Sequence, residues 1–150
     1  MARSILPRLA AALAALEGLQ AATVTALKPA DYMARVAEVS IEITPALSET
    51  PDRSDVRDAI DAAIRYHAFA ARAESVYEGR GDLAAIGRDP VVATCRPLTE
   101  LVARAAAQLG LDPSHPVVVG LVASTEGAPA LRTCAAEQIA EAERRARAPR

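Results

Sequence analysis

The side chains best suited to catalysis or metal binding are few in this chain of 150 residues, which contains two histidines and two cysteines. His67 falls on the inward row of a predicted helix, where an imidazole could act as a ligand or general base. A buried histidine that bonds to a backbone carbonyl fits the same position equally well. Together with Tyr66 and Tyr77, His67 is the candidate for a small-molecule pocket.

Cys95 and Cys134 lack the spacing of a zinc or redox motif, and two thiols alone form neither. They could form a disulfide, or they could be two small buried apolar residues. Each lies on the inward row near the start of a predicted helix, and an up-down-up path would make those two helices parallel neighbours. We therefore expect the two Cα atoms to lie within about 10 Å, or within about 7 Å if bonded. A bond would indicate an oxidising compartment.

Other catalytic patterns are missing. The sequence contains no nucleophile elbow, dinucleotide fingerprint, P-loop, zinc-protease motif or haem attachment motif. His115 stands in a helix-start sequence, Asp112 to Pro116, where adjacent Ser114 and His115 side chains would not converge. A metal site of Cys95, His115 and Cys134 would need three separate elements to meet. We expect no cofactor, no metal and no catalytic residues, which favours a non-enzymatic protein.

Composition excludes further classes. Apolar residues make up 51% of the chain, which excludes wholesale disorder, and aromatic residues make up 3%, which disfavours a β-sandwich or barrel. A net charge of −2 is too balanced for a general nucleic-acid binder. The basic C-terminal cluster contains Arg144, Arg145, Arg147 and Arg150. It follows Glu141 and Glu143 at helical spacing, which is typical of a solvated helix end.

Hydrophobic periodicity predicts an all-α bundle of five or six helices in a single domain, residues 1–150. The expected helices are 5–27, 31–43, 54–77, 90–109, 113–126 and 129–146, with a short turn at 82–87. Pro45 should end the second helix before a polar loop over 45–54, and Pro97 should kink the fourth. The alternative is a small βαβα C-terminal half, with strands at 91–95 and 117–122.

The N-terminal segment leaves the compartment open between cytoplasm and export. Arg3 and Arg8 with the apolar run 9–16 are similar to a signal-peptide core, but Glu17 interrupts the pattern, and a structural helix is favoured. Membrane contact is expected only through this helix, because no stretch is apolar enough for a confident span. The segment 12–69 resembles small exported bacterial helical proteins. The resemblance rests on residues 16–23, Tyr32, Arg35 and Tyr66. That likeness implies helices and no activity.

These observations predict a helical protein that acts through protein–protein contacts, such as an accessory or assembly subunit or an exported helical module. Helices rich in alanine bury little area each, so pairing with another protein or a second copy would stabilise them. The alternative is a helical small-molecule-binding or enzymatic domain with its pocket near His67.

Overall fold

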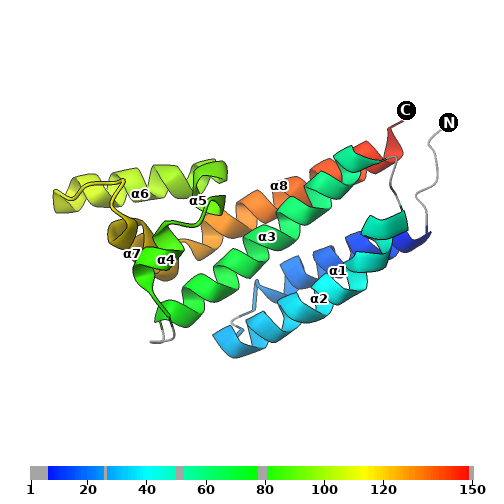
Figure 1. Cartoon of the computed structure of the whole chain (residues 1–150), viewed down its shortest axis with the longest axis horizontal. Coiled ribbons are helices and arrows are strands. Elements are labelled where there is room, and N and C mark those ends of the chain that lie inside the picture. The colour runs from blue at the N-terminus through cyan, green and yellow to red at the C-terminus, as the bar shows by residue number, and fades with distance from the viewer. Residues whose placement is uncertain (1–6, 26, 50–52, 78–80, 149–150) are drawn as a thin grey trace. The chain divides into compact units, whose positions relative to one another are not determined.

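The computed structural model describes residues 7–25, 27–49, 53–77 and 81–148, and this part of the chain is helical without strands (Figure 1). The all-α prediction is confirmed. The alternative βαβα half is wrong, because both of its expected strands are helical. The helices are α1 (Pro7–Ala22), α2 (Pro29–Glu49), α3 (Ser54–Tyr77), α4 (Leu83–Gly87), α5 (Val91–Thr94), α6 (Arg96–Leu109), α7 (Pro116–Glu126) and α8 (Ala128–Arg147). Arg3 and Arg150 lie outside the described residues.

The chain divides into two compact units, and the boundaries fall within α3 and α8. The first unit comprises residues 1–64 and 135–150, and the second comprises residues 65–134. In the first unit α1 packs against α2. The side of α1 that is buried follows a helical spacing of three and four residues. Its members are Leu9, Ala12, Leu13, Leu16 and Leu19.

Two helix ends in the first unit differ from the prediction. The expected helix 5–27 ends at Ala22, because the β-branched run 23–25 has low helix propensity. The hydroxyl of Thr23 donates to the Gln20 carbonyl at 2.7 Å and caps the last turn. In contrast, α2 continues through Pro45 to Glu49, so half of the expected loop over 45–54 is helical.

Pro45 is tolerated inside α2 because it lies on the exposed side of the helix. Its missing N–H leaves the carbonyl of Ile41 without the usual partner. The side chain of Ile41 is 74% exposed, so this carbonyl lies on the side of α2 that water reaches. Water can replace the lost hydrogen bond, and the helix is not broken.

In the second unit α4 packs against α7 with their backbones in close approach. A Cβ atom on Gly87 would lie 1.8 Å from the carbonyl oxygen of Pro116. A Cβ atom on Gly120 would lie 1.9 Å from the carbonyl oxygen of Leu83. Each glycine therefore allows a contact that an alanine would block.

The expected helix 90–109 is broken rather than kinked. Cys95 has extended dihedrals, φ −103° and ψ 96°, and separates α5 from α6. Pro97 then stands in the first turn of α6, where its missing N–H costs nothing. Gly110 ends α6 with φ 67°, as a C-cap glycine does.

The next helix begins later than expected, at Pro116 rather than at Pro113. A carboxylate oxygen of Asp112 accepts hydrogen bonds from the backbone N–H of Ser114 at 2.9 Å and from its hydroxyl at 2.7 Å. These bonds hold a turn before the helix. The N-cap of α7 is His115, whose Nδ1 accepts from the N–H of Val117 at 3.2 Å.

Candidate functional site

His67 lies inside the second unit with 1% of its surface exposed. Burial, with a smaller contribution from the guanidinium charge of Arg132, lowers the pKa of this imidazole from 6.5 to about 4. His67 is therefore neutral at pH 7. A buried neutral imidazole suits a core position better than a general base, which works best with a pKa near the operating pH.

Tyr66 and Tyr77 are the other two residues of the expected pocket. The hydroxyl of Tyr66 hydrogen-bonds to the carbonyl of Thr94 at 3.1 Å and lies 2.9 Å from the Thr94 hydroxyl. Tyr77 is the last residue of α3, and its side chain lies outside the described part of the structure. Ten residues of helix separate it from His67, a rise of about 15 Å.

Cys95 and Cys134 are joined by a disulfide in the second unit, with their Cα atoms 5.9 Å apart. Both residues are at least 95% buried, and the bond ties the break between α5 and α6 to α8. Sulfurs in a disulfide offer no thiolate to a metal, and His115 is engaged as a helix cap. Among the described residues no group of three His, Cys, Asp or Glu side chains is placed to hold a metal ion.

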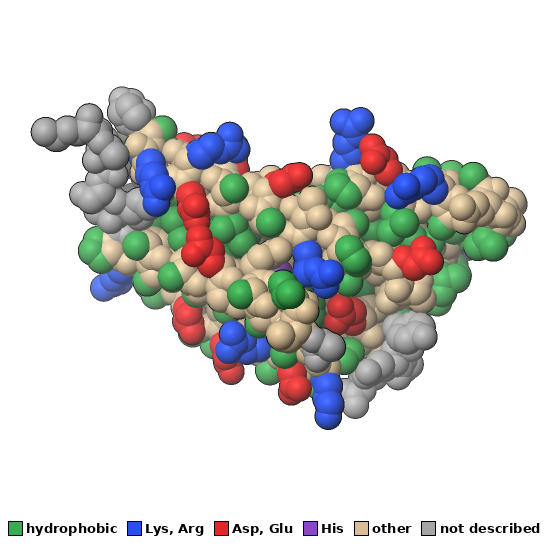
Figure 2. All heavy atoms as spheres, turned by 180° about the vertical axis from the view of Figure 1, so that it is seen from behind, with side chains coloured by type: hydrophobic (Ala, Val, Ile, Leu, Met, Phe, Trp, Pro, Cys, Tyr) green, Lys and Arg blue, Asp and Glu red, His purple; other side chains and the backbone are tan. Residues whose placement is uncertain are grey.

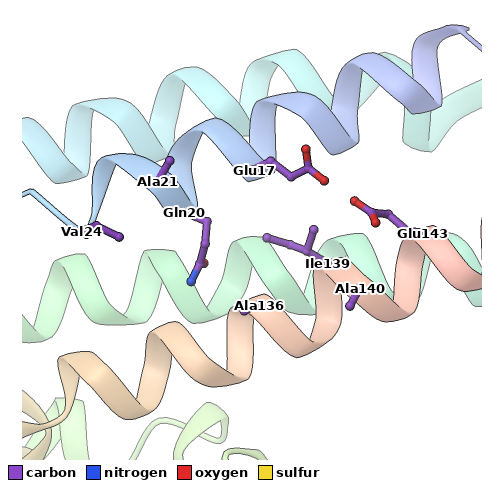
Figure 3. Close-up of a pocket in the computed structure, with 8 residues that line it drawn as sticks. All are labelled: Glu17, Gln20, Ala21, Val24, Ala136, Ile139, Ala140 and Glu143. Atoms are coloured by element: carbon purple, nitrogen blue, oxygen red, sulfur yellow. The ribbon is translucent and has the colours of Figure 1, made fainter.

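A groove of about 370 Å³ lies in the first unit between α1 and α8 (Figure 3). Each wall is a row at positions i, i+3, i+4 and i+7, which is one face of a helix. The α1 side contributes Glu17, Gln20, Ala21 and, just beyond the helix, Val24, and the α8 side contributes Ala136, Ile139, Ala140 and Glu143. The three alanines are exposed and small, so they leave the space that a larger side chain would fill.

The two ends of the groove differ in polarity. At one end the carboxyl groups of Glu17 and Glu143 point toward each other from α1 and α8 (Figure 3). A hydrogen bond in which the carboxyl group of Glu143 donates to the carboxylate of Glu17 raises the pKa of Glu143, and partial burial and the charge of Glu17 add to this effect. The charge of Arg147 opposes it. The other end carries Val24, whose side chain is 81% exposed. The site is therefore a short apolar groove with a pair of acids at one end.

Two arginines near the acidic end, Arg144 and Arg145, form hydrogen bonds or ion pairs with residues of α8 and of the start of α3. Arg145 donates to a carboxylate oxygen of Glu141 at 2.9 Å and to the backbone carbonyl of Asp55 at 2.7 Å. Arg144 also pairs with Glu141. On the face shown in Figure 2, basic and acidic side chains are interspersed, and neither sign forms a large patch. The pair of acids in the groove is therefore not part of a larger acidic patch on the face shown in Figure 2.

The sequence by itself gives the residues of this groove other interpretations. Glu17 interrupts a pattern similar to a signal-peptide core, and Glu143 lies four positions before Arg147, as in a solvated helix end. Gln138 on α8 is half-buried, whereas its neighbour Ile139 is 5% exposed. The repeated spacing 17–20–21–24 and 136–139–140–143 is the signal that could have identified the two walls.

Comparisons with models of known protein families, with curated proteins and with solved structures find no match to this chain. Within the described residues, no helix has the length and apolar character that crossing a membrane requires.

Proposed function

We propose that this protein acts through protein–protein contact, as an accessory or assembly subunit, and that the groove between α1 and α8 receives a segment of a partner protein. The observation that carries this proposal is the groove itself. Its two helical walls expose Ala21, Ala136, Ala140 and Val24, and a floor residue, Ile139, continues the apolar surface.

The shape of the groove favours a polypeptide occupant. Each wall spans seven residues, so the groove is about 10 Å long, which matches two turns of a helix. Small residues on both walls allow the backbone of a third helix to approach closely. Recognition of a helix in an apolar groove is a common mode of protein–protein contact, with anchors at helical spacing on the partner.

The disulfide supports the version of this proposal in which the protein is an exported helical module. Disulfides persist in oxidising compartments and are rare in the cytosol. The Cys95–Cys134 bond closes a chain segment with a sequence separation of 39. Alkylation of free thiols in cells of the source organism, before lysis, should leave both cysteines unmodified. Full labelling of both would contradict export.

A pair of matched variants tests the proposed contact. Ala140→Leu fills the groove from an exposed position, and Ala37→Leu makes the same change at an exposed position on α2. Each full-length variant would be used as bait in extracts of source cells, with quantitative mass spectrometry of the retained proteins. A partner retained by wild type and Ala37→Leu but lost with Ala140→Leu supports the proposal. Equal retention by all three baits contradicts it.

A further inference from the structure

We propose that the partner segment is an amphipathic helix that places one arginine or lysine between Glu17 and Glu143 and an aliphatic side chain, about two turns away, against Val24 and Ala136. This inference rests on the proposed function and specifies the chemistry of its partner. It follows from the charge at one end of the groove, from the apolar surface at the other, and from the distance between them.

The acidic end of the groove favours a positively charged side chain on the partner. The eight residues that line the groove include two carboxylic acids and no basic side chain. Arg147 acts on Glu143 from outside the lining, yet the effect of the facing Glu17 prevails, since the pKa of Glu143 is raised. A cation between the two carboxyl groups would favour their charged forms and oppose the effect that raises the pKa of Glu143. Two carboxylates also present the oxygen acceptors that a guanidinium or ammonium group binds.

The apolar end of the groove favours an aliphatic side chain on the partner. Val24 is 81% exposed on the α1 side of the groove, and Ala136 is exposed on the α8 side. Seven residues separate Glu17 from Val24 on one wall, and seven separate Ala136 from Glu143 on the other. On a partner helix the matching positions are a basic residue at i and a leucine or isoleucine at i+7, with small residues at i+3 and i+4 opposite the alanines.

A second copy of this chain docked groove to groove is a poorer occupant. A two-fold axis through the middle of the groove would place the acids of one copy against Val24 and Ala136 of the other. An axis at the acidic end would bring four carboxyl groups together. Both arrangements remove carboxylates from water without a cation, which is costly. The partner is therefore a different, basic segment.

Selection of displayed helical peptides on the full-length, disulfide-bonded protein tests the inference. The library keeps an alanine-rich helix and varies positions i, i+3, i+4 and i+7 over all amino acids. Selected peptides are then synthesised, and their affinities are measured by fluorescence anisotropy at low salt. The proteins compared are wild type, Glu17→Gln, Glu143→Gln and Ala140→Leu, with the exposed α2 variants Glu38→Gln and Ala37→Leu as matched controls.

We expect arginine or lysine at i with an aliphatic residue at i+7 among peptides that Ala140→Leu fails to bind. Each groove glutamine variant should weaken these peptides about fivefold, as expected for loss of one charge-assisted contact, and the α2 controls should not. Peptides that need the groove but carry no basic residue would overturn this inference and leave the proposed function standing. Absence of any peptide sensitive to Ala140→Leu would overturn both. Self-association of the wild type that Glu17→Gln abolishes would also overturn the inference, in favour of a second copy.

Discussion

The buried imidazole of His67 makes a specific prediction for the pH dependence of stability. Its pKa is about 4 in the folded protein and about 6.5 in the unfolded chain. Between these values the unfolded chain binds a proton that the folded protein excludes, so stability rises with pH. The contribution of His67 is fully present above pH 6.5 and is lost as the pH falls to 4.

The magnitude follows from the size of the shift. The difference between pKa 6.5 and about 4, at about 1.4 kcal/mol per pH unit, corresponds to about 3.5 kcal/mol of unfolding free energy in full, of which about 3 kcal/mol is lost between pH 7 and pH 4. Such a loss is a substantial part of the total stability of a small domain. Burial is the main cause of the shift and the charge of Arg132 is a secondary one, so most of the effect should survive at high salt.

Urea unfolding followed by circular dichroism, at several values from pH 7.5 to pH 4 with the disulfide intact, measures this loss. His67→Gln keeps a polar side chain but removes the titrating group. His115→Asn is the matched control, because His115 is the other histidine, is exposed, and caps α7 in a way that asparagine can reproduce.

We expect wild type and His115→Asn to lose about 3 kcal/mol more than His67→Gln between pH 7 and pH 4. Parallel loss in wild type and His67→Gln would refute the reasoning, because it would mean that the folded protein protonates His67 as readily as the unfolded chain does.

Four further predictions concern stability. Gly87→Ala should destabilise the protein by at least about 2 kcal/mol in thermal or urea unfolding, because its Cβ would overlap a backbone carbonyl of α7. Gly18→Ala, at an exposed α1 position with nothing within 4 Å, should stabilise it by up to about 1 kcal/mol, and a loss at both sites would contradict the packing described. Reduction of the Cys95–Cys134 bond, whose sequence separation is 39, should lower the unfolding free energy by about 4 kcal/mol on the loop-entropy relation, and unchanged stability under reductant would contradict the bond. Tyr66→Phe should cost about 1 kcal/mol in the same assay through loss of its hydroxyl contacts, whereas a neutral result would mean that water replaces them.

Local sequence determined much of the helical fold. The spacing of Leu9, Leu13 and Leu16 predicts the side of α1 that is buried, and these residues are buried. Gly110 ends α6 as its permissive backbone predicts. The main errors fall at prolines and in a run of β-branched residues. Pro45 lies within a helix because its side faces water, and Pro97 follows a break that extended Cys95 creates. In each case the exposure and backbone conformation at the site determine whether the helix continues, because the residue type alone does not.

Only the tertiary structure decided the candidate site. Glu17 and Glu143 are 126 positions apart, and each matches the pattern of a solvated helix surface when considered alone. Their meeting depends on the antiparallel packing of the α1 and α8 segments of the first unit, which no local spacing specifies. The burial of His67 was foreseeable from its row on α3, but its lowered pKa also depends on Arg132, which lies on α8. Helix periodicity is a local property of the chain, whereas the meeting of side chains from distant helices is set by how those helices pack.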